Sequence, residues 1–183
     1  MGKVIYGMAQ SLDGYVAAAD GQIGVPPPEE ALHRHFNAKM ARTAVALYGR
    51  RIYEIMRYWE TADTLPESQP WDVEFARLWQ DTPKVVVSST LLEVGPNATL
   101  LADDVDRGLQ ELVARTDGEI DVAGPTLAAT LTRLGLIDEY HLYLHPVVLG
   151  GGLPFFAGGQ PLQLRILGVD ELSQGVRCLR YGR

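Results

Sequence analysis

The sequence predicts an α/β fold with a mostly parallel central sheet, helices on both faces, and an antiparallel strand pair at the C-terminal end. Strand-like apolar runs alternate with amphipathic segments along most of the 183 residues, as parallel sheets require. The run KVVV at residues 84–87 lacks an apolar–polar alternation, which is typical of a strand buried on both faces. The last two apolar runs have no helix between them, so they are expected to pair antiparallel.

The first half of the chain is expected to contain two buried strands, two helices and one long loop. The predicted elements are strands at 3–9 and 43–48, helices at 29–41 and 52–56, and a loop at 17–28. The helix at 29–41 has an apolar stripe and acidic residues in its first turn, which the helix dipole favours. The loop contains three consecutive prolines and two glycines, so little regular structure is expected there.

The second half continues the alternation and then ends in strands only. The predicted elements are helices at 73–79, 104–115 and 125–134, and strands at 84–87, 120–123, 138–149, 162–167 and 176–181. Pro125 suits the first helical turn, where its missing N–H has no intrahelical partner, and Gly135 is placed where a helix stop is expected. The helix from Pro125 carries leucines on one face, so it is expected to pack on a sheet.

Composition and charge limit the classes of function. The length and the 46% hydrophobic content predict one domain over residues 1–183. A formal net charge of −7 gives no general attraction to nucleic acid or to an anionic membrane, and no apolar run approaches the roughly 20 residues of a membrane span. A cytoplasmic protein is therefore expected. The single cysteine, Cys178, lies in a strand-like alternation and is interpreted as a packing residue.

Polar or glycine-rich sequence follows five predicted strands. These strand exits are residues 10–14, 49–51, 88–90, 124–126 and 150–152. In open sheets of this kind, ligands bind outside the carboxyl ends of the strands. Gly124 leads directly into a helix N-terminus, whose free N–H groups and positive dipole end suit a phosphate. The agreement among the five exits predicts a ligand site at this edge of the sheet.

Two of these exits have both a functional and a structural interpretation. Arg50 and Arg51 oppose the dipole of the helix that they begin, so helix propensity does not explain them. Their guanidinium groups would suit a phosphate, or they are solvated surface charges. The hydroxyls of Ser88, Ser89 and Thr90 can bond phosphate oxygens, although capping of the next turn is their commoner role.

Several stretches resemble a known family. They are YGRRIYE from Tyr48, VVVSST from Val85, the block VAGPTLAATLTRLGLIDEYHLYLHPVVLGGG from Val122, and the ending QGVRCLRYGR. Together they resemble the dihydrofolate reductase-like fold, a three-layer α/β/α arrangement, and within it the RibD C-terminal reductase domain of bacterial deaminase-reductases. The Ser-Leu-Asp-Gly of that branch is present at residues 11–14. The resemblance covers nearly the whole chain.

The resemblance implies an NADPH-dependent reductase of a small polar or heteroaromatic substrate, similar to 5-amino-6-(5-phosphoribosylamino)uracil reductase of riboflavin biosynthesis. The cofactor-binding residues that it implies are Gly14, Gly49, Arg50, Arg51, Ser88, Ser89, Gly124, Thr126, Leu127 and Gly150. The substrate-binding residues that it implies are Ser11, Leu32, His33, Phe36 and Gly151, with Asp13 as the catalytic residue. Paired arginines are a physically reasonable way to select the 2′-phosphate that distinguishes NADPH from NADH.

The acid–base candidates also have structural interpretations. Asp13 is a substrate ligand or proton-relay group, or simply a turn aspartate. Glu30 and His33 are weaker candidates, and for them a first-turn helix acid and a surface histidine are the preferred interpretations. No metal is expected, because His141 and His145 would be about 13 Å apart along one strand at about 3.3 Å per residue.

The chain departs from the family pattern at two places. Ile52 stands where the family usually has Thr, and Ala123-Gly124-Pro125 stands where it usually has Gly-Gly. Each change removes a hydrogen-bonding group from a phosphate site, so a ligand-binding protein on the same fold without reductase turnover is the alternative. A homo-oligomeric scaffold is a third possibility. The resemblance also suggests a homodimer whose only ligands are small molecules.

Overall fold

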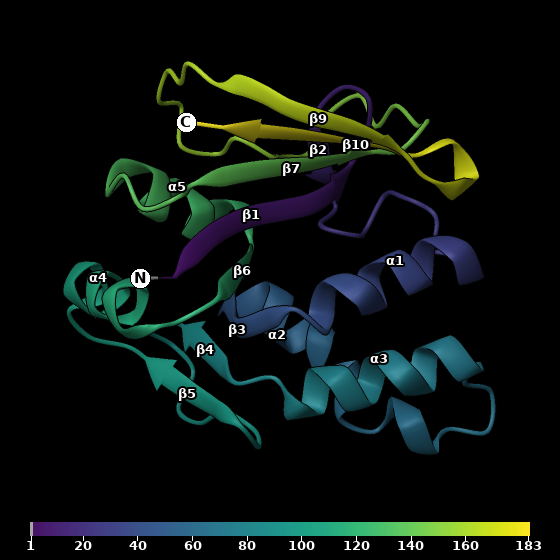
Figure 1. The fold of residues 1–183 in the computed structure, drawn as a ribbon, viewed down its shortest axis with the longest axis horizontal. Helices are drawn as coiled ribbons and strands as arrows, with labels where there is room; N and C mark the ends of the chain where they lie inside the picture. The colour runs from purple at the N-terminus through teal and green to yellow at the C-terminus, as the bar shows by residue number, and fades with distance from the viewer. Residues whose placement is uncertain (1) are drawn as a thin grey trace.

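The computed structural model describes residues 2–183, which build an eight-stranded sheet in the order β5-β4-β3-β6-β1-β7-β10-β9 (Figure 1). The strands of this sheet are β1 (Lys3–Gln10), β3 (Thr43–Gly49), β4 (Lys84–Val87), β5 (Ala98–Leu101), β6 (Glu119–Ala123), β7 (Glu139–Leu144), β9 (Arg165–Glu171) and β10 (Arg177–Gly182). The helices are α1 (Glu30–Met40), α2 (Arg50–Met56), α3 (Pro70–Asp81), α4 (Val105–Arg115) and α5 (Pro125–Arg133). Short 3₁₀ turns cover Arg57–Glu60, Ala62–Thr64 and Ser173–Gly175.

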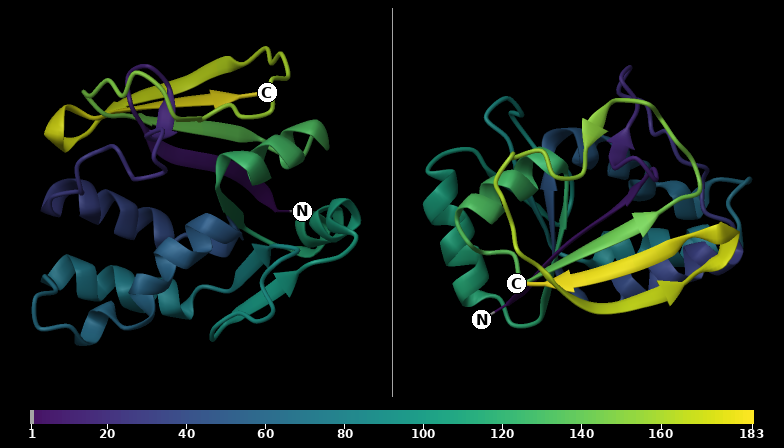
Figure 2. Two further views of the ribbon diagram at one scale, coloured as in Figure 1. Left: turned by 180° about the vertical axis from the view of Figure 1, so that it is seen from behind. Right: turned by 90° about the horizontal axis from the view of Figure 1, so that it is seen from above.

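Strands β5, β4, β3, β6, β1 and β7 pair in parallel, and β10 pairs antiparallel with both β7 and β9. The predicted fold class is therefore confirmed, including the antiparallel C-terminal pair. Two very short strands, β2 (Tyr15–Ala17) and β8 (Leu153–Pro154), form a separate antiparallel ribbon. The right-hand view of Figure 2 shows this ribbon beside the carboxyl end of β1.

The helices divide between the two faces of the sheet, which gives three layers (Figures 1 and 2). Helices α4 and α5 pack on one face through residues such as Leu109, Leu127 and Leu131, against Leu47 and Val122 of the sheet. The alternate residues of the same strands point to the other face. There Ala46 and Tyr48 meet Phe75 and Trp79 of α3. This period-two alternation of side chains is what a strand covered on both faces requires.

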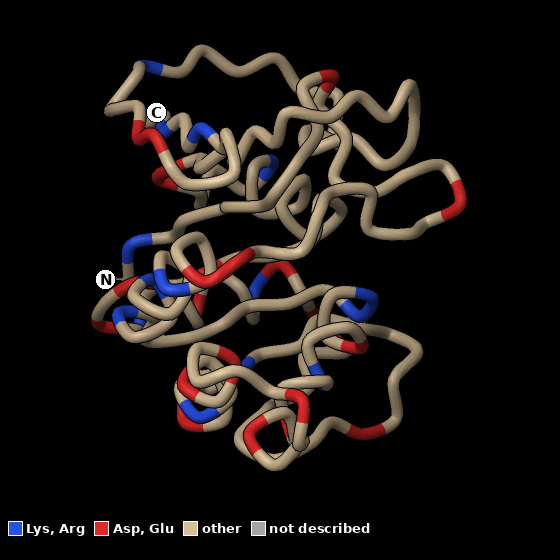
Figure 3. The backbone as a smooth tube through the Cα atoms, turned by 90° about the vertical axis from the view of Figure 1, so that its right-hand side faces the viewer, with Lys and Arg blue, Asp and Glu red and all other residues tan. Residues whose placement is uncertain are grey.

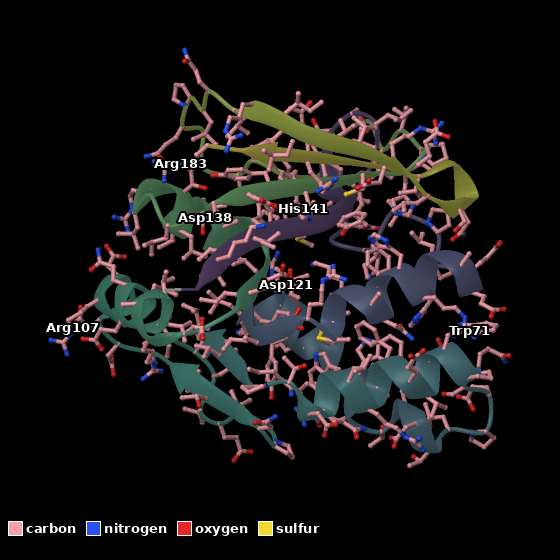
Figure 4. All side chains as sticks on the ribbon, in the orientation of Figure 1. Trp71, Arg107, Asp121, Asp138, His141 and Arg183 are labelled. Carbon is pink, nitrogen blue, oxygen red and sulfur yellow. The ribbon has the colours of Figure 1, made fainter. Side chains whose placement is uncertain are left out.

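The α1 side of the sheet also carries a buried ion pair. Lys39 of α1 lies 2.5 Å from the carboxylate of Asp121 in β6, and both side chains are largely buried. Asp121 is labelled in Figure 4 beside α1. Breaking such a pair by removing one partner is strongly destabilising, because it leaves an uncompensated charge away from water. The pair fixes the position of α1 against the sheet.

Helix α3 is longer than the sequence suggests, since it begins at Pro70 and not at Val73. Gln69 and Asp72 form a capping box at its start, where the backbone N–H of Gln69 donates to the Asp72 carboxylate. At its other end the buried ammonium of Lys84 donates to the carbonyls of Trp79 and Thr82, each at 2.6 Å. A cation suits a helix C-terminus. Burial lowers the pKa of Lys84 to about 8.

Two strand predictions are wrong in their boundaries. The strand expected at 138–149 ends at Leu144, because Pro146 and three glycines follow it. The penultimate strand covers Arg165–Glu171 instead of 162–167. Leu162 and Leu164 do pack against the core, but they do so from a loop. The apolar alternation at residues 162–164 therefore reflects burial of these side chains, not pairing in a strand.

Charged residues are distributed over the molecule, with acidic and basic side chains interspersed along the backbone (Figure 3). Within residues 2–183 no helix is long and apolar enough to cross a membrane. Cys178 is buried, as the packing interpretation predicted, and burial raises the pKa of its thiol to about 11.

Candidate functional site

A large cavity opens at the carboxyl ends of the parallel strands. Its volume of about 1110 Å³ is slightly above the usual range for ligand pockets, about 300–1,000 Å³. The lining comes from residues 8–9, 16–19, 21, 23, 25, 49–52, 55, 87–90, 102, 105, 124–127 and 152–153. The predicted exits at 49–51, 88–90 and 124–126 all contribute to it. The cavity therefore lies at the edge of the sheet where the sequence predicts a ligand site.

The centre of the cavity lies where β3 and β6 end side by side. The chain leaves β3 toward α2, α3 and then β4, and it leaves β6 toward α5 on the opposite face and then β7. Adjacent strands whose connections depart in opposite directions define the topological switch point, where ligands of open α/β sheets bind.

Gly124 and Gly49 make this crevice possible. Gly124 has φ 114° and ψ 115°, and a Cβ atom there would lie 3.6 Å from the backbone nitrogen of Gly49. A side chain at Gly124 would be strained and would fill the space between the starts of α2 and α5. The first N–H groups of each helix have no intrahelical acceptor, so those of Thr126 and Leu127 are available to an anion.

The two arginines lie at the rim of the same crevice. Arg50 donates from Nη1 to the hydroxyl of Thr90 at 2.9 Å and lies 3.5 Å from Glu54. Within residues 2–183 no hydrogen bond or ion pair involves the Arg51 side chain, which is exposed. Both residues line the cavity. Two guanidinium groups beside a helix start give the crevice a strong local positive charge in a chain of net negative charge.

The Ser88 hydroxyl, at the end of β4, has a structural role. The Ser88 hydroxyl accepts the backbone N–H groups of Thr90 at 3.2 Å and Leu91 at 3.1 Å, so the capping interpretation is confirmed for this residue. Ser89 and Thr90 are exposed where they line the cavity. The Ser89 hydroxyl is therefore accessible to a ligand held by the arginines, whereas the Thr90 hydroxyl already accepts from Arg50.

At the other two exits, residues 10–14, Gly150 and Gly151 lie outside the cavity lining, and Asp13 binds the backbone of the second exit. The Asp13 carboxylate accepts the N–H groups of Leu149 at 3.1 Å and Gly150 at 2.7 Å. Ser11 is buried, and its hydroxyl accepts the N–H of Tyr15 at 3.0 Å. The Ser11 side chain, with smaller effects from the Leu149 and Gly150 N–H groups, holds the pKa of Asp13 below its usual value.

Gly14 and the triple glycine complete this second arrangement. Gly14 has φ 90°, and its carbonyl accepts the N–H of Phe155 at 2.9 Å, which joins the turn after β1 to β8. Gly150 and Gly151 have no heavy atom near their Cβ positions, whereas a Cβ at Gly152 would collide with the carbonyl of Ala17. Gly152 therefore permits the close approach of β2 and β8, and it lines the cavity while Gly150 and Gly151 do not.

The residues expected on α1 also lie away from the cavity lining. Leu32 is buried with Tyr143, Val176 and Cys178, and the ring of Phe36 packs edge-on against Tyr143 at 5.1 Å. Part of the lining comes instead from β2, from loop residues 18, 19, 21, 23 and 25, and from residues 152–153.

His33 is only 5% exposed, so its interpretation as a surface histidine is wrong. Its ring bonds Asn37 at 2.9 Å and approaches the carboxylate of Asp72 in α3 at 3.2 Å. It connects α1 to α3. Glu30 remains a first-turn helix acid, and its carboxylate accepts a bond from Arg34 at 2.9 Å.

Sequence reasoning missed the apolar part of the cavity. Met8, Val16, Ile23 and Leu153 line it. Met8 and Val16 looked like ordinary core residues, and Ile23 lies in a loop that carries no motif. The only signal was the length of the 17–28 loop, since long loops in compact domains are often part of binding sites. Among residues 2–183, no group of three His, Cys, Asp or Glu side chains is arranged to hold a metal ion.

The three layers, the mostly parallel sheet and the antiparallel C-terminal pair define a dihydrofolate reductase-like fold. The chain superposes on dihydrofolate reductase from Enterococcus faecalis, solved in complex with NADP(H), with a TM-score of 0.61 over 99% of this chain and 96% of that one. Their sequences are 14% identical, so this likeness concerns the fold alone.

Residues 2–178 match the RibD C-terminal domain, and the chain belongs to that family. A putative riboflavin biosynthesis protein from Shewanella sp. PV-4 superposes with a TM-score of 0.75 and 23% identity, covering 99% of this chain and 98% of that chain. The uncharacterized protein YyaP of Bacillus subtilis (strain 168) is 26% identical, covering 98% of this chain and 94% of its own. The family assignment, and with it a reductase-like function, follows from this match.

Proposed function

We propose that this protein is an NADPH-dependent reductase of a small substrate. The observation that carries the proposal is the meeting of Gly49, Arg50 and Gly124 in one cavity of about 1110 Å³ at the switch point of the sheet. Membership in the RibD C-terminal family supports a reductase of the type found in riboflavin biosynthesis. The name of the Shewanella relative points the same way.

The residues of the crevice fit the phosphates of a dinucleotide. The start of α5, with the free N–H groups of Thr126 and Leu127, would hold the pyrophosphate, and Gly124 leaves room for it. Arg50 and Arg51 would hold the adenosine 2′-phosphate, with Ser89 beside it. Two guanidinium groups for one phosphate favour NADPH over NADH.

The departure at Ile52 alters this fit without closing the site. Its Cγ1 atom lies 3.7 Å from the Cβ position of Gly124, so the side chain packs against the floor of the crevice. A hydroxyl ligand for phosphate is lost there. The expected loss of binding free energy is about 0.5–1.5 kcal/mol, the net value of one neutral hydrogen bond. The arginine pair, whose hydrogen bonds are charge-assisted, contributes more than that loss.

The cofactor supplies a hydride from its reduced nicotinamide, and the protein supplies binding, orientation and exclusion of water. Met8, Val16 and Leu153 give the remaining part of the cavity an apolar wall next to the phosphate-binding half. Asp13 acts as a positioning residue, because its carboxylate ties the 149–150 backbone to the turn after β1. That contact holds β2 and β8 in place as one side of the cavity.

The alternative is a ligand-binding protein on the same fold without turnover. It is favoured by the absence of Asp, Glu or His among the residues that line the cavity within the described chain. The two functions differ in one measurable property, which is oxidation of the bound cofactor.

The deciding experiment follows NADPH absorbance at 340 nm with purified protein. The acceptors are pyrimidine substrates, including 5-amino-6-(5-phosphoribosylamino)uracil, together with uncharged carbonyl compounds. Reduction of any acceptor that is lost in an Arg50→Gln/Arg51→Gln variant supports the reductase. NADPH binding without oxidation by any of them would favour the alternative.

A further inference from the structure

We propose that Gln174, in the turn between β9 and β10, is a positioning residue for the ligand cavity, because it fixes the loop that follows β2 as part of the cavity lining. Gln174 itself lies outside that lining. In Figure 1 the turn lies at the right, above the start of α1. This role is independent of which reaction takes place in the cavity, and two observations support it: a strained backbone and a pair of long-range hydrogen bonds.

Gln174 has a backbone conformation that glutamine rarely adopts. Its φ of 59° and ψ of 22° lie in the left-handed region, where the Cβ atom crowds the following carbonyl. Two other non-glycine residues of the described chain have positive φ, and they are Asn97 and Asp104, whose short polar side chains tolerate this region. Glycine would adopt the turn without strain, so the side chain of Gln174 is expected to have a role.

The Gln174 side chain binds backbone up to 145 residues earlier in the chain. Its Oε1 atom accepts the N–H of Glu29 at 2.8 Å, and its Nε2 atom donates to the carbonyl of Pro27 at 3.2 Å. The amide thus pairs with the two backbone groups that flank Pro28, as a neighbouring strand would. Glu29 is the N-cap residue of α1 and makes no side-chain cap of its own. Gln174 therefore fixes the point where the loop ends and α1 begins.

Three consecutive prolines carry this constraint toward the cavity. Residues 26–28 are all proline, and each ring locks φ near −65°. The residue before a proline is restricted to extended conformations, so Val25 has little freedom either. Val25 and Ile23 line the cavity. Fixing the backbone at the end of the prolines therefore also limits where these two side chains lie.

The rest of the loop has few other attachments. Residues 18–22 form a compact turn with internal hydrogen bonds. Gly24 lies against Leu149, since a Cβ atom at Gly24 would be 2.6 Å from Leu149 Cδ2. Within the described chain, the bond from Gln174 is the only hydrogen bond that residues 23–28 make. Loss of the Gln174 amide should therefore free this part of the loop to move away from the cavity.

A loop that leaves the cavity part of the time lowers the affinity for any ligand that contacts it. The apparent affinity falls in proportion to the fraction of molecules in which the lining is complete. Two neutral hydrogen bonds hold the loop, so we expect their loss to weaken ligand binding by roughly threefold to tenfold.

Two variants separate the hydrogen bonds from the backbone strain. Gln174→Met keeps a side chain of similar length and the strained φ but removes both bonds, whereas Gln174→Gly removes the same bonds and relieves the strain. Gln174→Gly should have the higher Tm of the two, while calorimetry with NADPH as the probe should show the same loss of affinity in both. Affinity that follows Tm, with Gln174→Gly binding as tightly as wild type, would show a merely structural role and overturn the inference.

Thermolysin digestion tests the loop without any ligand. The enzyme cleaves before large apolar residues, and Ile23 is 58% exposed, so the bond between Gln22 and Ile23 reports opening of the loop. Under native conditions the cleavage rate follows the population of the open form. Cleavage at this bond should be roughly threefold to tenfold faster in Gln174→Met and Gln174→Gly than in wild type.

Two further variants complete the digestion experiment. Gln174→Glu still accepts the N–H of Glu29, so its cleavage rate should lie between those of wild type and Gln174→Met. Gln160→Met is the matched control and should be cleaved like wild type, because Gln160 is exposed and makes no side-chain hydrogen bond within residues 2–183. Cleavage as slow in Gln174→Met and Gln174→Gly as in wild type would overturn the inference. If wild type does not bind NADPH, the proposed function fails, and these rates still decide whether Gln174 fixes the loop.

Discussion

Two pairs of glycine-containing segments meet at the carboxyl edge of the sheet, and they differ in where their polar groups find partners. At the β3 and β6 exits, Gly49 and Gly124 approach each other and leave helix N–H groups and Arg51 without protein partners in residues 2–183. At the β1 exit and the triple glycine, Asp13 accepts the N–H groups of Leu149 and Gly150.

Similar residues at strand ends therefore have opposite roles at the two places. Both pairs combine glycines with charged residues at strand ends, and both suggested a ligand site from sequence. Polar groups that satisfy one another within the chain build a scaffold, whereas groups left without partners at the edge of a cavity are available to a ligand. Four substitutions test this distinction.

The largest effect is expected from Gly124→Val. The residue would have to keep φ near 114° with its Cβ 3.6 Å from the Gly49 nitrogen, so the crevice would be both strained and filled. We expect NADPH affinity to fall by on the order of a hundredfold, corresponding to about 2.7 kcal/mol. Gly159→Val is the control, because Gly159 also has positive φ but no heavy atom within 4 Å of its Cβ position. Equal NADPH affinity in both variants would contradict the crevice assignment.

Arg51→Gln tests the positive charge at the β3 exit. A charge-assisted hydrogen bond is worth about 1.5–3 kcal/mol, so the Kd for NADPH should rise by about 10- to 100-fold while that for NADH stays unchanged. Arg107→Gln is the matched control, since Arg107 projects from α4 with 71% of its side chain exposed (Figure 4). A parallel loss of NADH and NADPH binding would mean that Arg51 does not contact the 2′-phosphate.

Ile52→Thr adds a hydroxyl to the floor of the crevice beside Gly124. One additional neutral hydrogen bond to a phosphate would tighten NADPH binding by about 2- to 10-fold. Ile55→Thr, at another position of the cavity lining, should leave binding unchanged. Titration of both variants with NADPH measures the difference. Weaker binding in Ile52→Thr would show that the apolar packing of Ile52 matters more than the added hydroxyl.

Asp13→Asn should have the smallest effect on cofactor binding, with the NADPH Kd changing by less than about threefold. The reason is that Asp13 bonds the backbone of Leu149 and Gly150 and therefore positions β2 and β8 without contacting the cavity. The substitution should instead change how strongly acid lowers the stability of the folded protein. The folded-state pKa of Asp13 is lowered, so its stabilising contribution is present above the unfolded value of about 3.9 and is lost as the pH falls through the folded value.

Thermal unfolding between pH 7 and pH 3 measures this contribution. The Tm of wild type should fall more steeply than that of Asp13→Asn below about pH 4. A loss of NADPH binding as large as that of Arg51→Gln would instead place Asp13 in the cofactor site.

The sequence predicted the sheet and its carboxyl edge because both depend on local patterns. Apolar runs, the Pro125 helix start and the glycines at strand ends are visible without any tertiary information. The position of His33 was not predictable, because its burial depends on α3 packing against α1 across more than 30 residues of sequence. Whether Asp13 faced a ligand or the backbone of Leu149 also depended on a contact 136 residues away.

The apolar part of the cavity could not be predicted, because it too depends on contacts between distant segments. Its residues are those of any core, and only the pairing of β2 with β8 turns Val16 and Leu153 into a wall beside the phosphate crevice. A two-stranded ribbon of five residues leaves almost no periodic signal in a sequence. The loop that follows β2 contributes alanine, glycine, isoleucine and valine residues that form no recognisable motif.

The most direct test of the central claim is titration of the purified wild-type protein with NADPH and with NADH, following quenching of tryptophan emission by the reduced nicotinamide. A crevice built from Gly49, Gly124 and two arginines should bind NADPH with a micromolar Kd and NADH at least tenfold more weakly. Equal affinity for the two dinucleotides would contradict the role of the arginine pair, and binding of neither would contradict the assignment of the crevice to a cofactor.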